Sequence, residues 1–207
     1  MSYTQPQPML SVLAANWWTF LLRGIAAVLL GLVVLYPWPL RIDSVFVLLV
    51  SFGAYALVDG ILALVAGLRG SLGHMWPLVV EGVLGVLAGL ITFFWPYLEV
   101  ILEVTNLNLY IIAAWAISTG ISEVAMAVSL GREIDPSFWQ KIDPSFYMGF
   151  SGVLSMLFGL LVAAAATSAL DSYVFPLIVL YAPTFGLVLI RLGVRVRGPR
   201  QRNGRVS

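Results

Sequence analysis

Six runs of mostly apolar residues limit the fold of this chain more than any other feature. They cover about residues 17–36, 44–68, 76–95, 107–130, 144–167 and 173–193. A helix of roughly 20 apolar residues is long enough to cross the hydrocarbon core of a bilayer. The runs do not alternate apolar and polar residues as the strands of a membrane β-barrel do. The sequence therefore predicts an all-α integral membrane bundle of six transmembrane helices.

Composition excludes most catalytic and binding classes. Apolar residues make up 60% of the chain and charged residues only 10%, so a water-soluble fold is not expected. There is no Cys, and there is one His and one Lys, which leaves little for nucleophilic, acid–base or metal chemistry. The formal net charge of +1 gives no field to attract nucleic acid. We expect no enzyme, no cofactor, no metal and no nucleic-acid partner.

The distribution of basic residues predicts the topology and the division of the chain. Residues 1–16 form an N-terminal cytoplasmic or interfacial segment, 17–193 the transmembrane domain, and 194–207 a basic tail. Basic residues gather on one side of the predicted membrane, in the tail and in the loops after the second and fourth helices, at Arg69, Arg132 and Lys141. The other side has Arg41 beside the acidic residues Asp43, Glu99, Glu103 and Asp171. Because positive loops stay inside, both termini are expected in the cytoplasm.

Small residues recur at one helical phase in the first, third and fifth predicted helices. Offsets of 0, 3 and 7 place them on one helix face, where small residues let backbones approach closely in lipid. The predicted packing residues are Gly24, Ala27, Gly31, Gly82, Gly85, Gly89, Gly152, Ser155 and Gly159. We expect these three helices to face inward and to pack together. Glycines that line a path for a solute remain the functional alternative.

The second, fourth and sixth predicted helices repeat as well. Six-residue stretches beginning at Tyr55, Trp115 and Tyr181 align, and each ends in glycine. The repeating unit is therefore a helical hairpin used three times, over about residues 17–68, 76–130 and 144–193. Pro183 departs from this pattern and predicts a kink in the sixth helix, a feature that a transporter with a broken helix would share.

Four ionisable residues lie inside the predicted spans: Arg23, Asp59, Glu81 and Glu123. At 1.5 Å per residue, all four fall in the cytoplasmic half of the membrane, within a band on the order of 10 Å. Such residues are costly in lipid and are expected to meet one another. One interpretation is an ion-pair cluster that fixes the register of the helices. The other is a proton-responsive site, because one arginine faces three carboxyl groups.

The predicted loop between the fourth and fifth helices contains a direct repeat. Residues 134–138 and 142–146 both read Ile-Asp-Pro-Ser-Phe. Aspartate followed by proline is typical of a helix start, because the carboxylate caps free N–H groups and proline fits the first turn. We expect the second copy to begin the fifth helix at Pro144.

These repeated motifs resemble the HdeD family of bacterial multi-pass inner-membrane proteins, over about residues 16–192. The resemblance rests on Asn16-Trp17-Trp18, Arg23-Gly24 with Gly31, residues 55–60, Glu81-Gly82 with Gly89 and Trp95-Pro96, residues 113–117 with Gly120, and Ser151-Gly152 with Gly159. It implies a non-enzymatic protein of the inner membrane with a role in acid stress or membrane homeostasis, and it supplies no catalytic residues. The repeated loop, the long segment 98–108 and the missing proline after the fifth helix depart from the usual pattern of the family.

Two other classes of function remain open at this point. A small transporter or proton-coupled channel would need a water-accessible cavity that reaches the charged residues. An accessory or scaffold subunit would bind another membrane complex through an apolar face. The expected partners are the lipid bilayer and, beyond it, a second copy of the chain or another membrane protein.

Overall fold

A computed structural model describes residues 9–36, 44–69, 72–94, 106–133, 144–167 and 174–197. The described residues form seven helices and no strands. They are α1 (Met9–Ala15), α2 (Trp17–Leu35), α4 (Ser44–Arg69), α5 (Leu72–Phe93), α7 (Leu107–Glu133), α8 (Pro144–Ala166) and α9 (Val174–Arg197). Six of these helices are long and apolar enough to cross a membrane. The all-α, six-span fold is thus confirmed, and the chain is a multi-pass membrane protein.

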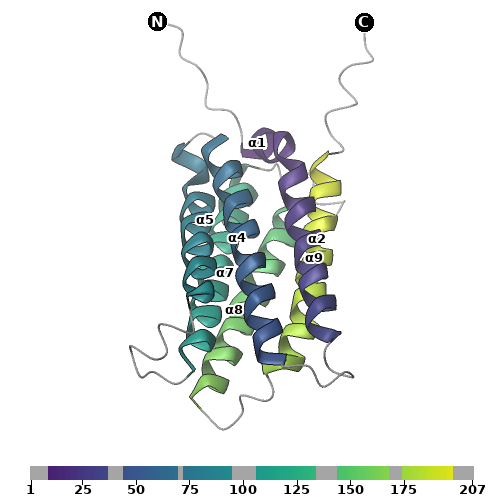
Figure 1. The fold of residues 1–207 in the computed structure, drawn as a ribbon. Coiled ribbons are helices and arrows are strands. Elements are labelled where there is room, and N and C mark those ends of the chain that lie inside the picture. The colour runs from purple at the N-terminus through teal and green to yellow at the C-terminus, as the bar shows by residue number, and fades with distance from the viewer. Residues whose placement is uncertain are drawn as a thin grey trace, which may run out of the picture.

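The six long helices stand side by side, and α1 lies across one end of the bundle (Figure 1). We call this the α1 end. Helices α2, α5 and α8 begin there, while α4, α7 and α9 return to it. The outer surface carries large apolar side chains such as Leu160 and Leu180, which are 58% and 70% exposed. Lipid would cover such a surface, because hydrocarbon tails are as apolar as leucine.

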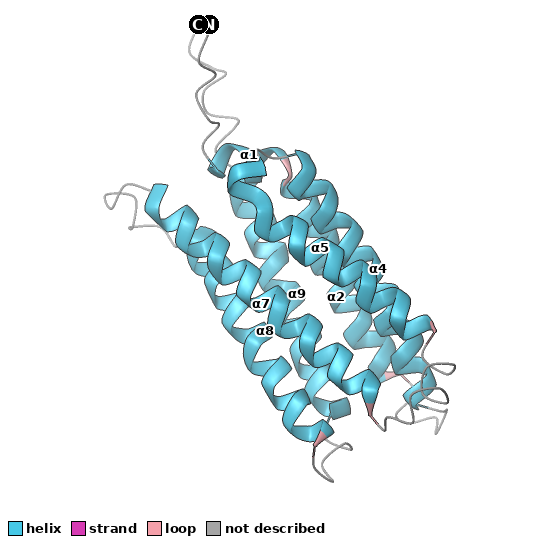
Figure 2. Ribbon diagram, turned by 90° about the vertical axis from the view of Figure 1, so that its left-hand side faces the viewer, coloured by secondary structure: helices cyan, strands magenta, loops and turns pink. Residues whose placement is uncertain are grey.

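The closest packing joins neighbouring repeats. Helix α4 packs most closely on α5, α7 on α8, and α2 on α9, whereas the two helices of each predicted hairpin share fewer contacts. The last of these tight pairs brings together the first and last spans, so the three pairs close into a ring. Figure 2 shows α4 beside α5 and α7 beside α8.

Glycine against glycine creates each tight pair. A Cβ atom built on Gly24 would lie 2.6 Å from the carbonyl oxygen of Gly186. A Cβ atom on Gly82 would lie 2.7 Å from the carbonyl oxygen of Gly60. A Cβ atom on Gly152 would likewise lie 2.7 Å from the carbonyl oxygen of Gly120. Real Cβ atoms do not approach backbone this closely, so only glycine allows these helices to touch along their backbones.

The nine predicted packing residues are all buried, but the expected arrangement of their helices is wrong. These helices do not pack together through their glycines. A Cβ on Gly31 would meet the Pro183 ring of α9 at 2.6 Å, and one on Gly89 would meet the oxygen of Gly53 in α4 at 2.9 Å. One on Gly159 would lie 2.8 Å from the oxygen of Ala113 in α7. The glycine faces of α2, α5 and α8 therefore pack on α9, α4 and α7, respectively. In each case the partner helix belongs to a neighbouring repeat.

Helix α9 continues through Pro183 as one element, so it is not the broken helix that a transporter would favour. Proline removes one backbone hydrogen bond from a helix. The close fit of its ring against Gly31 packs this part of α9 on α2.

Helix α1 is short and is separated from α2 by Asn16, whose φ of −107° and ψ of 21° are not helical. The Asn16 side chain donates a hydrogen bond to the carbonyl oxygen of Val12 at 3.1 Å. Leu13 is only 1% exposed, and α1 contacts both α9 and α7. Helix α1 thus covers part of the bundle end.

Several predictions fall on residues outside the described part of the chain. These are the first copy of the Ile-Asp-Pro-Ser-Phe repeat, the basic tail beyond Arg197, and Arg41, Asp43, Glu99, Glu103, Lys141 and Asp171. The second copy is described from Pro144 onward, and α8 begins at Pro144 as predicted.

Candidate functional site: a buried charged cluster

Three of the four predicted charged residues meet in the bundle interior. The Arg23 guanidinium of α2 donates from Nε to Oδ1 of Asp59 at 2.7 Å and from Nη2 to Oδ2 at 3.2 Å. Its Nη2 also donates to Oε1 of Glu81. All three residues are at most 1% exposed. A planar guanidinium suits this geometry because its fixed fork matches the two oxygens of a carboxylate.

The glycines explain why these side chains point inward. Arg23, Asp59 and Glu81 each precede a glycine that contacts the partner helix of a tight pair. One residue corresponds to a rotation of about 100° around a helix. When the glycine faces its partner, the preceding side chain is turned away from that contact, and all three turn into the bundle interior.

Glu123 of α7 occupies the same buried space without a cationic partner. It is 2% exposed and lies within electrostatic range of Glu81, Arg23 and Asp59. The Ser151 hydroxyl of α8 lies near it and donates a hydrogen bond to the carbonyl oxygen of Met148 at 3.0 Å. Among the described residues, the ion pairs of Arg23 are with Asp59 and Glu81, and Glu123 forms none. We call Arg23, Asp59, Glu81 and Glu123 the charged cluster.

The charged cluster departs from the threefold pattern of the repeat. Arg23, Glu81 and Ser151 occupy one repeat position, and Asp59 and Thr119 occupy another, where the third repeat has Phe185. The first repeat thus supplies an ion pair, the second an acid and a hydroxyl, and the third a hydroxyl and an aromatic ring. Glu123 is an additional acid at a position where the other repeats have Ala63 and Leu189.

An aromatic layer lies next to the charged cluster, on the side away from the α1 end. It consists of Tyr55, Trp115 and Tyr181, which share one repeat position and are all buried. Tyr55 meets Trp115 edge-on, with ring centroids 5.5 Å apart. Tyr181 stacks on Phe158 at 4.0 Å. These rings fill the centre of the bundle.

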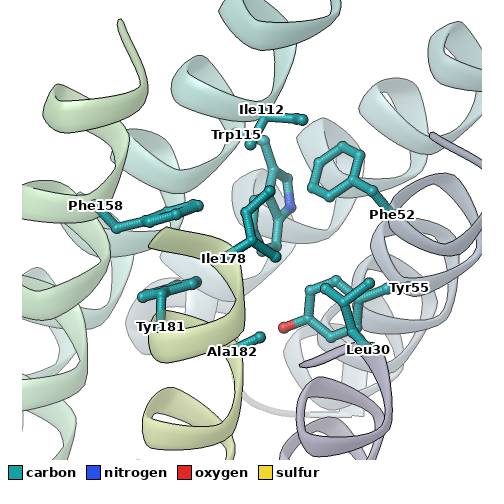
Figure 3. Close-up of a pocket in the computed structure, with 9 residues that line it drawn as sticks. All are labelled: Leu30, Phe52, Tyr55, Ile112, Trp115, Phe158, Ile178, Tyr181 and Ala182. Atoms are coloured by element: carbon teal, nitrogen blue, oxygen red, sulfur yellow. The ribbon is translucent and has the colours of Figure 1, made fainter. Parts of the chain in front are cut away.

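A small cavity of about 10 Å³ lies at this aromatic layer. Only apolar atoms face it, and small apolar cavities of this kind stay dry. Figure 3 shows the rings of Tyr55, Trp115 and Tyr181 around it, together with Phe52 and Phe158. The Tyr181 hydroxyl pairs with Ser155 Oγ at 2.8 Å, and Ser155 donates to the carbonyl oxygen of Ala116 at 2.9 Å.

Sequence reasoning missed two parts of this site. The sequence distinguishes Ser151 only as part of a Ser151-Gly152 motif, although its side chain lies near Glu123. The aromatic layer is visible in the sequence only as part of a repeat motif. Its signal was present in the sequence, because a Tyr or Trp recurs at the same inward phase of three helices.

For metals, the residues that the structure describes contain no group of three or more His, Asp or Glu able to hold an ion.

The geometry can be compared with known proteins. The family model of a short repeat of unknown function, DUF308, matches residues 22–94 and again residues 80–164. No curated protein and no solved structure matches the chain. The two matched stretches together cover more than half of the chain and include the whole charged cluster, so this membrane protein belongs to the DUF308 short-repeat family.

Proposed function

We propose that this chain is a non-enzymatic, HdeD-like protein of the bacterial inner membrane that serves in acid stress or membrane homeostasis, and that it responds to acid by binding protons at the charged cluster. HdeD-like proteins belong to the family that matches the chain. The observation that carries the proposal is the composition of the cluster, in which one guanidinium stands against three carboxyl groups inside the bundle.

The charge balance supports proton binding. With every group ionised, the charged cluster would hold a formal charge of −2 inside a low-dielectric interior, from one Arg and three acids. Uncompensated buried charge is strongly unfavourable, and a bound proton removes it at little structural cost. Asp59 accepts two hydrogen bonds from Arg23. Glu123 has only the nearby Ser151 hydroxyl, whose proton is donated to the Met148 carbonyl oxygen. Glu123 is therefore the group best placed to carry a proton.

Every neighbouring helix contributes to the environment of Glu123. The facing polar and charged groups are Arg23 of α2, Asp59 of α4, Glu81 of α5, Ser151 of α8 and Tyr181 of α9. Among these groups only Arg23 is a cation, and it is already engaged by two acids. A proton that arrives at Glu123 would also weaken the repulsion between Glu123 and Glu81.

The basic residues support an orientation with the α1 end in the cytoplasm. Helices α4 and α9 end at this end of the bundle with Arg69 and Arg197. The side chain of each lies over a tryptophan of α2. Arg69 lies 5.5 Å from the Trp18 ring and Arg197 lies 4.4 Å from the Trp17 ring. Interfacial tryptophans and positive inner loops favour this assignment. It brings the charged cluster nearer to the cytoplasmic surface.

Proton uptake by purified protein in lipid nanodiscs tests the proposal. We expect the wild-type chain to take up about one proton more than the Glu81→Gln/Glu123→Gln variant when a weakly buffered sample passes from neutral to mildly acidic pH. The control is Glu99→Gln, which changes an acid outside the charged cluster. Equal uptake by the wild type and the double variant would contradict the proposal.

A flux assay separates this function from that of a proton-coupled transporter. The preference for a proton-binding protein rests on the packed rings of the aromatic layer, which occupy the bundle centre beside the charged cluster. Liposomes that contain the protein and a pH-sensitive dye are expected to acidify no faster than empty liposomes. Faster acidification that is lost in Glu81→Gln would favour the transporter instead.

The scaffold alternative is tested by purification in mild detergent. We expect a homogeneous species without a second protein in stoichiometric amount. A partner that co-purifies with the wild type at a fixed ratio would favour an accessory subunit of a larger membrane complex.

A further inference from the structure

Five buried polar atoms near the centre of the bundle have no hydrogen-bond partner among the described residues. They are Glu81 Oε2, Glu123 Oε2, Thr119 Oγ1, Tyr55 OH and Trp115 Nε1. An unpaired buried polar group costs free energy comparable to a lost hydrogen bond, and native structures contain few of them. Five such groups together would rival the net stability of an ordinary domain. They therefore require partners.

These atoms belong to one region of the fold. Trp115, Thr119 and Glu123 follow one another at four-residue spacing on α7, which places them in a column along one helix face. The Tyr55 ring lies against Trp115, with centroids 5.5 Å apart, and its hydroxyl is within electrostatic range of Glu123. Glu81 interacts with Glu123 from α5.

The donors and acceptors in this set are complementary. The indole N–H of Trp115 can only donate, the two carboxylate oxygens can accept, and the hydroxyls of Tyr55 and Thr119 can do both. A metal cation would bind the oxygens but would leave the indole N–H unpaired. Water both donates and accepts, and it bridges groups that cannot reach one another directly.

We propose that the interior of the bundle contains a water-binding site in which ordered water links the free carboxylate oxygens of Glu81 and Glu123 to Thr119, Tyr55 and Trp115. The site extends from the charged cluster to the aromatic layer and is built mainly on α7. It supplies a hydrogen-bonded path by which a proton passes between the two carboxyl groups. The inference goes beyond the proposed function, because the unpaired atoms require water whether or not the cluster responds to acid.

Variants that remove one hydroxyl at nearly constant shape test the site. We expect Thr119→Val and Tyr55→Phe each to lower the unfolding temperature by about 2–4 °C, because a water-bonded hydroxyl stabilises the fold. Thr184→Val is the matched control, since the Thr184 hydroxyl bonds only within its own helix, to the carbonyl oxygen of Leu180 at 2.7 Å, and is exposed. An unfolding temperature that is unchanged or raised relative to this control would overturn the proposal, because deleting a dry, unpaired hydroxyl relieves strain.

A spectroscopic measurement gives a readout that does not depend on stability. Infrared spectra of the protein in ordinary and ¹⁸O-labelled water are compared in the O–H stretching region. An internal-water band that shifts with the isotope, and that is altered in Thr119→Val and Tyr55→Phe but not in Thr184→Val, is the expected result. The same spectrum in all four proteins would overturn the proposal. The band should persist even if proton uptake fails, so the two proposals fail separately.

Discussion

The guanidinium of Arg23 lies 2.7 Å from Asp59 and thereby joins two helices that belong to different tight pairs. Arg23 is on α2, which packs on α9, and Asp59 is on α4, which packs on α5. Close backbone contacts at glycine hold each pair together internally. Contacts between pairs are made by polar and aromatic side chains, such as Arg23 with Asp59 and Tyr181 with Ser155. A change in charge at the charged cluster would therefore alter the contacts that hold the three tight pairs together.

Replacement of Arg23 should be strongly destabilising. Arg23→Met would leave three buried acids without their only cation, and breaking a buried ion pair from one side costs about 3–5 kcal/mol. Thermal unfolding in detergent measures the change. Arg191→Met is the control, because Arg191 is exposed on the surface of α9. The combined variant Arg23→Met/Asp59→Asn should recover part of the loss, and a double variant that is additive would contradict a direct interaction.

A methyl group at a glycine contact should force the helices of a tight pair apart. The Cβ atom of Gly82→Ala would lie 2.7 Å from the carbonyl oxygen of Gly60, and overpacking of this kind costs about 1–3 kcal/mol. Gly149→Ala is the control, since its Cβ would meet Ala127 at an ordinary 3.5 Å. We expect the control to keep or raise the unfolding temperature, because alanine favours a helix more than glycine does. Equal effects of the two variants would argue against close packing of α4 on α5.

Closure of the ring by α2 and α9 can be tested with an engineered disulfide. A Cβ on Gly193 would lie 3.0 Å from Cγ of Leu21, and the natural chain contains no Cys to interfere. After cleavage between α5 and α7, we expect the two fragments of Leu21→Cys/Gly193→Cys to remain joined until a reductant is added. The control pair is Leu21→Cys/Val194→Cys, because Val194 is exposed. Fragments that separate in both variants would show that α2 and α9 are not neighbours.

Much of the fold was predictable from hydropathy alone. Each of the six apolar runs became a helix, and α2, α4, α7 and α8 begin at the predicted residues. The differences lie at other helix ends, where hydropathy does not report helical structure. Helix α5 begins at Leu72, ahead of the apolar run, and α9 extends past Gly193 to Arg197. Gly193 lies inside its helix, where a Cβ atom would be 3.0 Å from the carbonyl oxygen of Trp17.

The pairing of the helices was not predictable from the repeat. Gly24 of the first span and Gly186 of the last contact each other, and the repeated pattern does not distinguish this partner from a glycine of the same hairpin. Sequence periodicity fixes which face of a helix packs, but it does not determine which helix it packs on. The charged residues were easier to group, because acids and an arginine at similar depth in a membrane have few alternatives to one another. The free hydroxyls of Tyr55 and Thr119 required coordinates.

Infrared difference spectroscopy of the carboxyl groups tests the central claim most directly. The carbonyl band of protonated carboxylic acids is followed in membranes from neutral to acidic pH, in the wild type and in Glu123→Gln. We predict a band that changes in the mildly acidic range and loses a component in the variant. A band that changes only around pH 4, where exposed carboxyl groups titrate, and that is the same in both proteins would contradict a proton-binding charged cluster.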